Sequence, residues 1–136
     1  IQPNSLADQK WTYSTTMKRI ILITLWITFF EFLRNEILFK SEWITHYKTL
    51  GLTFTTTPLN GILWMLWSVL LAYLIITLRA YKSHNETVCI AWLVTFPSMW
   101  IVLYNLHVLP LHLLLYAIPL SMIEVYIATR LISILK

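Results

Sequence analysis

The side chains best suited to chemistry are a few charged and polar residues inside otherwise apolar stretches. Glu31, Arg34 and Asn35 follow one such stretch, and Glu124 ends another. A charged side chain inside a bilayer costs about 3 kcal/mol on insertion scales unless it is protonated, paired or hydrated. We therefore expect Glu31 to be ionised against Arg34, one helical turn away. We expect Glu124, which has no basic neighbour in the sequence, to be protonated or to exchange a proton at neutral pH.

Depth in a bilayer is expected to bring these groups together. At about 1.5 Å per helical residue, Glu31 and Glu124 lie roughly 16 and 15 Å from the same membrane face. Ser68 and Ser98 fall near that level. We predict a midplane site for a proton, an ion or a small solute, in which the two carboxyls exchange and Arg34 tunes Glu31. The predicted site comprises Glu31, Arg34, Asn35, Ser98, Ser121 and Glu124.

The elements that must position these residues are long apolar helices. Hydrophobic residues make up 58% of the 136 residues and charged residues only 12%, against roughly 25% charged in soluble domains. Residues 59–78 and 87–123 carry no formal charge. The second run is too long for a single span, so we place a turn at residues 105–110, where Asn, His and Pro gather. A soluble all-helical protein would need polar faces that these runs lack.

The predicted fold is all-α, an integral membrane antiparallel four-helix bundle. Residues 1–16 form a polar N-terminal segment, and residues 17–136 form the transmembrane domain. Short connections between alternating spans favour an antiparallel arrangement. The four spans are expected at about 18–39, 58–80, 87–106 and 109–135.

Each predicted span carries a stripe of small or polar residues at helical spacing. Residues three or four apart share a helix face, and small residues let membrane helices approach closely. We expect the stripes to face one another. Their members are Thr24, Thr28, Glu31 and Asn35; Gly61, Ser68, Ala72 and Arg79; Ala91, Thr95, Ser98 and Asn105; and Ala117, Ser121, Glu124 and Ala128.

Basic residues are distributed unequally between the two sides of this arrangement. The formal net charge is +4, which we interpret as orientation and lipid headgroup contact rather than nucleic-acid binding. The positive-inside rule then places both termini in the cytoplasm, with a bacterial inner membrane as the expected location. The residues on the predicted cytoplasmic side are Lys10, Lys18, Arg19, Arg79, Lys82, Arg130 and Lys136.

Two prolines are expected inside spans. Pro97 and Pro119 each remove a donor and so free a carbonyl one turn earlier, on Leu93 and Leu115. Such carbonyls are tolerated where neighbouring groups satisfy them, and they also build ion and solute sites. The alternative is that the prolines only shape the helices and that the charged cluster holds the helices together.

The loop at residues 40–57 is expected to contain a short interfacial helix. Ser41 would cap it, Trp43 and Tyr47 would lie on one side, and Gly51 would end it. Pro58 is expected to open the second span.

Three further constellations are considered. Histidine and carboxylate suit a transition metal, and the candidates are His46, His107 and His112 with Glu36 or Glu42. Deep tryptophans either pack the core or line a pocket for an apolar or cationic ligand, and the candidates are Trp26, Trp67 and Trp100. Cys89 is the single cysteine, so redox pairs of the Cys-x-x-Cys type are excluded.

The layout of the chain carries a resemblance to known families. Charged and aromatic residues end the first span at 29–35, an interfacial loop with Trp and Tyr follows, and residues 58–61 (Pro-Leu-Asn-Gly) open the second span. This layout resembles uncharacterised bacterial families of small four-span membrane proteins. It covers most of residues 17–136 and implies no activity. Glu31 is also similar in position to the membrane-embedded Glu of small multidrug transporters, although its surroundings differ.

The sequence therefore favours a small multi-pass membrane protein that binds or translocates a proton, ion or small solute. A homo-oligomer is expected, because a bundle this small encloses little space. The alternative is a non-catalytic structural or assembly subunit of a larger membrane complex. A lipid-modifying enzyme is a third class, which is disfavoured because no nucleophile or metal motif is present. The sequence does not identify a cofactor.

Overall fold

The computed structural model describes residues 6–134, with side chains from residue 15 onward. This part of the chain is helical, with turns and an extended stretch at 52–57 between helices. The predicted all-α class is confirmed. The elements are α1 (Leu6–Phe32), a π-helical segment (Leu33–Leu38), α2 (Lys40–Thr49), α3 (Pro58–Tyr81), α4 (His84–Asn105), a 3₁₀ turn (Leu111–Leu113) and α5 (Leu114–Ile134).

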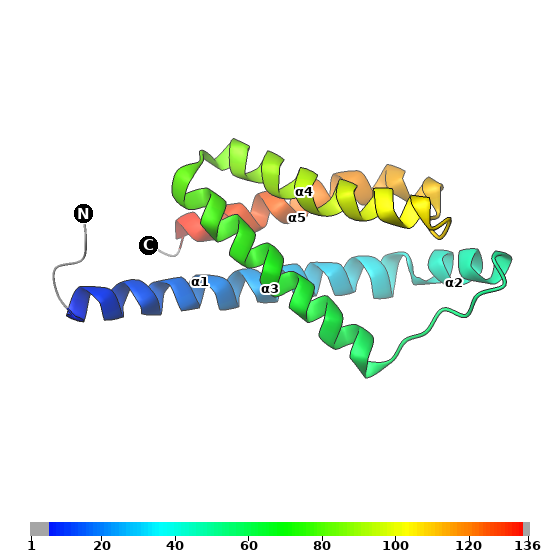
Figure 1. Cartoon of the computed structure of the whole chain (residues 1–136), viewed down its shortest axis with the longest axis horizontal. Helices are drawn as coiled ribbons and strands as arrows, with labels where there is room; N and C mark the ends of the chain where they lie inside the picture. Colours follow the sequence, from blue (N-terminus) through cyan, green and yellow to red (C-terminus); the bar gives the residue numbers. More distant parts are fainter. Residues whose placement is uncertain (1–5, 135–136) are drawn as a thin grey trace.

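The four long helices alternate in direction (Figure 1). α1 packs against α3 and α5, and α4 packs against the same two helices. The start of α1, the α3–α4 turn and the end of α5 lie at one end of the molecule, which we call the turn end. α2 and the connection between α4 and α5 lie at the other, which we call the α2 end (Figure 1).

Within the described part of the chain, three helical segments are long and apolar enough to cross a membrane, namely Pro58–Tyr81, His84–Asn105 and Leu111–Ile134. They match the predicted second, third and fourth spans to within a few residues. α1 is not among them, because Lys18, Arg19 and Glu31 interrupt its apolar stretch. α1 also begins at Leu6, so no helix boundary separates residues 6–16 from the predicted first span. The four-span membrane bundle therefore stays a prediction.

Local capping explains where the spans begin and end. Pro58 occupies the first turn of α3, and the Thr57 N–H donates to Asn60 Oδ1 at 2.9 Å. The side chains of Ser83 and Glu86 cap α4 reciprocally, which starts that helix at His84 rather than at residue 87. α4 ends within the predicted turn, and His107 has a positive φ of 58° there.

The short helix α2 confirms one part of the loop prediction and corrects another. It runs over Lys40–Thr49, and Gly51 follows it with a φ of 71°, a left-handed conformation that glycine adopts without steric cost. Phe39 precedes its first residue, and Ser41 lies inside it. Ser41 is therefore not the cap that the sequence suggested.

Apolar side chains fill the centre of the helix packing. Its members come from all four long helices and include Ile23, Leu71, Ile75, Val88 and Val125. The small residues of the predicted stripes are completely buried at five positions, namely Ser68, Ala72, Ala91, Ser121 and Ala128. Gly61 and Ser98 are exposed, and no heavy atom lies near the position of a Cβ added at Gly61.

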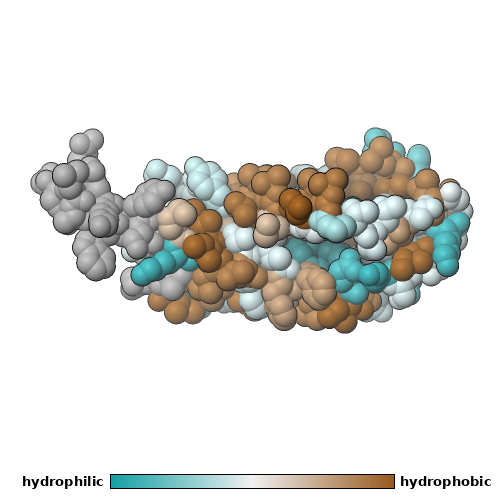
Figure 2. Space-filling view, turned by 90° about the horizontal axis from the view of Figure 1, so that it is seen from below, coloured by the Kyte–Doolittle hydropathy of each residue, from teal (hydrophilic) through white to brown (hydrophobic). Residues whose placement is uncertain are grey.

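Much of the outer surface is hydrophobic, as Figure 2 shows for one face. Large apolar side chains on separate helices are more than half exposed, among them Leu25, Leu70, Ile101 and Leu115. Apolar faces of this extent suit lipid or another membrane protein better than water.

Candidate functional site

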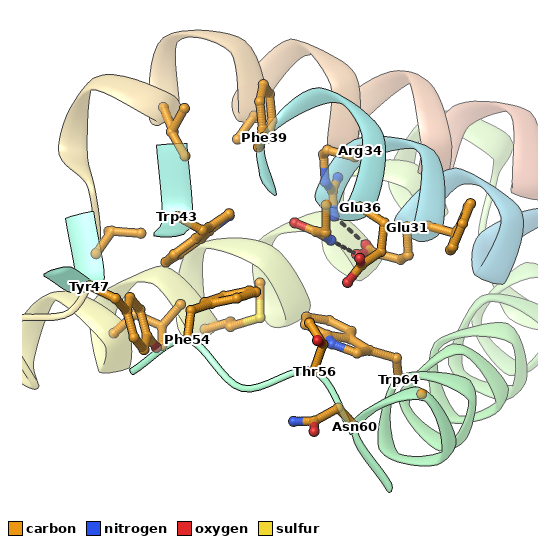
Figure 3. A pocket seen from close by; sticks show the side chains of 18 of the residues that line it. Glu31, Arg34, Glu36, Phe39, Trp43, Tyr47, Phe54, Thr56, Asn60 and Trp64 are labelled. Carbon is orange, nitrogen blue, oxygen red and sulfur yellow. Dashed lines mark hydrogen bonds and ion pairs between the residues drawn. The ribbon is translucent and has the colours of Figure 1, made fainter. Parts of the chain in front are cut away.

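Two carboxyl groups from opposite ends of the chain meet at one buried arginine. Arg34 Nη1 donates to Glu124 Oε2 at 3.0 Å, and Arg34 Nη2 pairs with Glu31 Oε1. Asn35 Nδ2 donates to Glu31 Oε2 at 2.7 Å. The exposed fractions of Glu31, Arg34 and Glu124 are 3%, 4% and 0%. We call Glu31, Arg34, Asn35 and Glu124 the Arg34 cluster. Figure 3 shows Glu31 and Arg34 within it.

The structure gives Glu124 a basic partner that the sequence did not predict. The sequence offers no basic residue near Glu124, yet Arg34 lies beside it although the two are 90 positions apart. Arg34 sits in the π-helical segment, where the Phe39 N–H donates to the Arg34 carbonyl at 2.9 Å, five residues back. A π-helical turn accommodates one extra residue and shifts the register of the side chains around it. Arg34 thereby faces α5 as well as Glu31.

Two aromatic contacts hold the Arg34 cluster in place. Trp26 Nε1 donates to the Glu124 backbone carbonyl at 3.1 Å, which ties α1 to α5. The Arg34 guanidinium lies over the Phe96 ring, 5.0 Å from its centroid. A guanidinium over an aromatic face is attracted by the ring quadrupole. The cluster and its aromatic contacts therefore involve α1, the π-helical segment, α4 and α5.

The charges in the Arg34 cluster do not balance when both carboxyls are ionised. Two carboxylates against one guanidinium leave one negative charge, and one added proton makes the cluster neutral. Glu124 Oε1 is buried and has no hydrogen-bond partner among the described residues. An uncompensated charge in a buried site is costly. The arrangement is therefore chemically able to hold and release one proton.

The two predicted serines lie outside the direct contacts of this cluster. Ser121 is buried one turn from Glu124, where it accepts from Trp92 Nε1 at 2.9 Å. Ser98 is exposed, and its Oγ donates to the Leu93 carbonyl at 3.4 Å. That carbonyl is the one that Pro97 deprives of a donor, as predicted. Ser98 thus serves its own helix, and the structure does not bring it to Glu31 or Glu124.

A cavity of about 570 Å³ adjoins the Arg34 cluster at the α2 end. Glu31, Arg34 and Asn35 line its buried part, while the extended stretch before α3 lines its exposed part. Figure 2 shows a hollow with hydrophilic atoms between hydrophobic side chains on one face of the molecule. Figure 3 shows aromatic rings facing this space from α2, α3 and the intervening loop. The aromatic residues that line it are Phe32, Phe39, Trp43, Tyr47, Phe54, Trp64 and Trp100.

The sequence did not predict most of the aromatic residues that line the cavity. It placed Trp43 and Tyr47 on one side of a short interfacial helix, and the structure places both of them, together with Trp64, around the cavity. Of the deep tryptophans, Trp100 lines the cavity, and Trp26 and Trp67 pack against the apolar core. The available signal was the density of aromatic residues in and around the loop at 40–57.

The histidines of the candidate metal group do not assemble. His112 Nε2 lies 3.0 Å from Glu42 Oε2, and both side chains are largely exposed. Within residues that the structure describes, no three His, Cys, Asp or Glu side chains are placed to hold a metal ion. His46 and His107 therefore do not join this pair.

Comparison with known proteins gives no relative from which to transfer a role. No family model, curated protein or solved structure matches this chain. The resemblance to small four-span families stays a prediction, and the Arg34 cluster and the cavity beside it are the features of this chain that point to a function.

Proposed function

We propose that this chain is a multi-pass membrane protein that binds a small solute in the cavity and carries a proton across the membrane by exchange at the Arg34 cluster. One observation carries the proposal: two buried carboxyls share one guanidinium at the buried end of an aromatic-walled cavity. Cavities of roughly 300–1,000 Å³ are the size at which proteins bind small molecules. Of the two carboxyls, Glu31 links the proton site to the solute site, since it belongs to the cluster and also lines the cavity.

The charge excess supports exchange over a purely structural role. A single carboxylate is enough to balance Arg34, so a second buried carboxyl adds desolvation cost without adding a cation. Such groups inside membranes are uncommon and mark proton and ion pathways. Alternation between the protonated and ionised forms would explain why a second carboxyl is present despite its desolvation cost.

The same proposal includes the membrane arrangement. α1 and its π-helical segment would form the fourth span beside the three apolar helices, with the charged groups of residues 31–34 turned inward. Arg79 is in the last turn of α3, Lys82 follows that helix, and Arg130 lies close to the end of α5. These three basic residues support a cytoplasmic position for the turn end. The cavity at the α2 end would then face the opposite side of a bacterial inner membrane.

Proton flux into proteoliposomes tests the proposal. Vesicles that contain a pH-sensitive dye would be given a membrane potential with potassium and valinomycin, and acidification would be followed by fluorescence. We expect Glu31→Gln and Glu124→Gln to slow protein-dependent acidification at least tenfold, because glutamine keeps the shape but carries no exchangeable acidic proton. Glu42→Gln is the matched control, since Glu42 does not line the cavity and pairs with His112 Nε2 at 3.0 Å outside the cluster. Equal flux in all four proteins would reject the proposal.

The exposed apolar faces favour a second candidate function, that of a structural or assembly subunit. Side chains such as Leu70, Ile101 and Leu115 are available to another membrane helix, including one from a second copy of this chain. Purification in mild detergent distinguishes the two functions. A stable partner at fixed stoichiometry, together with no flux from the wild type, would favour the subunit role.

A further inference from the structure

The basic group of the cavity is already occupied. Both terminal nitrogens of Arg34 are paired with carboxyl oxygens, and Phe96 covers one face of the guanidinium. Among the described lining residues no lysine, histidine or second arginine is present. Lys40 lies near the cavity and is paired with Glu36 at 2.6 Å. An anionic ligand would therefore find no free cation to bind.

The carboxyls at the cavity, in contrast, carry more charge than the one guanidinium balances. Glu31 lines the cavity, and Glu124 lies outside the lining and is paired with Arg34 Nη1. The two carboxyls exceed the single guanidinium by one negative charge when both are ionised. Glu36 does not alter this balance, because Lys40 neutralises it. A ligand with one positive charge would complement the buried end of the cavity.

The walls suit a cation that carries an apolar body. Trp43 and Tyr47 form an edge-to-face pair with ring centroids 6.2 Å apart, and Tyr47 and Phe54 form another at 5.3 Å. Trp64 and Trp100 complete the aromatic lining, and Figure 3 shows several of these rings around one space. Aromatic faces attract organic cations, most strongly when water is excluded. Quaternary and aromatic ammonium compounds match this combination.

We infer that the cavity binds a small organic cation, with the charged end toward Glu31 and the apolar body among the rings of Trp43, Tyr47 and Trp64. The inference rests on the proposed function, because it names the class of solute. The ligand and a proton would compensate the same excess negative charge. Binding of the cation would then release the proton from a carboxyl to water, and loss of the cation would take it up again.

Binding of three small probes to the protein in lipid nanodiscs tests this inference. Benzyltrimethylammonium is the cation, N-benzylacetamide the neutral probe and phenylmethanesulfonate the anion, each titrated calorimetrically and corrected with empty nanodiscs. We expect the cation to bind at least tenfold more tightly than the neutral probe, and the anion not to bind. Glu31→Gln is expected to lower the affinity for the cation at least tenfold and to leave that for the neutral probe unchanged.

A second pair of variants tests the aromatic wall without altering charge. Trp64→Leu is expected to weaken binding of the cation several-fold, since Trp64 lines the cavity. Tyr73→Leu is the matched control, because Tyr73 is an aromatic residue of the same helix, 62% exposed and outside the cavity. Equal losses in the two variants would contradict an aromatic binding wall.

The remaining outcomes distinguish failure of the inference from failure of the proposed function on which it rests. Equal affinity for all three probes would overturn the choice of a cation and leave a solute-binding cavity. Tight binding of the cation that Glu31→Gln does not change would place the ligand elsewhere and overturn the inference. No binding of any probe, with normal proton flux in vesicles, would overturn the inference and retain proton exchange at the Arg34 cluster.

Discussion

The two ends of the helix packing contain different kinds of side chain. Near the turn end, apolar side chains such as Ile75, Val88 and Ile132 fill the space between helices. Near the α2 end, the same helices enclose Glu31, Arg34 and Glu124 and border a cavity. Apolar packing stabilises the helix assembly, whereas buried charge and empty space cost free energy. The contrast indicates that the turn end holds the fold together and that the α2 end carries the function.

The largest expected effect comes from removing the shared cation. Arg34→Met leaves two buried carboxyls without a partner, and breaking a buried ion pair in this way costs about 3–5 kcal/mol. Unfolding in mixed detergent micelles, followed by circular dichroism, measures the change in the free energy of unfolding. Arg130→Met is the control, because Arg130 is exposed and lies over the Tyr126 ring at the turn end. A similar loss in both variants would remove the distinction between the two ends.

A cavity made at the turn end should separate stability from function. Ile75 is completely buried, and Ile75→Ala is expected to cost about 2–5 kcal/mol through lost contacts. Proton flux per folded protein should stay at the wild-type level, since the Arg34 cluster is untouched. Leu70→Ala provides the comparison on the same helix, because Leu70 is 60% exposed. A flux defect in Ile75→Ala would show that the two ends are not independent.

The hydrogen bond beside the cluster should have a smaller effect. Ser121→Ala removes the acceptor of Trp92 Nε1, and an unsatisfied buried donor costs about 1–3 kcal/mol. We expect a loss near the lower figure in detergent unfolding and at most a modest change in proton flux. Abolition of flux by this variant would instead make Ser121 a member of the exchanging site.

The smallest effect is expected at Ser98. Its hydroxyl is exposed and donates over 3.4 Å to a carbonyl of its own helix, so Ser98→Ala should change the free energy of unfolding by less than about 0.5 kcal/mol. Proton flux should be unchanged. Loss of flux would restore the sequence-based assignment of Ser98 to the site.

The apolar helices were predictable because their signal is local. Residues 59–78 and 87–123 carry no charge over lengths that only membrane helices or buried helices use, and the turn near His107 is marked by Asn and Pro. The meeting of Glu31 and Glu124 also followed from the sequence, through helix geometry and equal depth. These features depend on composition and spacing along single helices.

The remaining features depend on where helices lie relative to one another. The π-helical segment at Leu33–Leu38 has no clear sequence signal, yet it aims Arg34 at Glu124 across 90 residues. Ser98 shares a predicted face with Ala91, but Pro97 leaves a carbonyl that recruits its hydroxyl locally. Residues of α2, of the loop that follows it, of α3 and of α5 line the cavity together, and periodicity within single helices does not reveal this arrangement.

A double-mutant cycle between Arg34 and Glu124 tests the central claim most directly. Free energies of unfolding would be measured for the wild type, Arg34→Met, Glu124→Gln and the double variant in the same micelles. Direct contact at 3.0 Å predicts a coupling of at least about 1.5 kcal/mol, with the double variant more stable than Arg34→Met alone. Additive effects within about 0.3 kcal/mol would mean that the two residues do not touch. That result would contradict the site, the proton exchange and the cation cavity together.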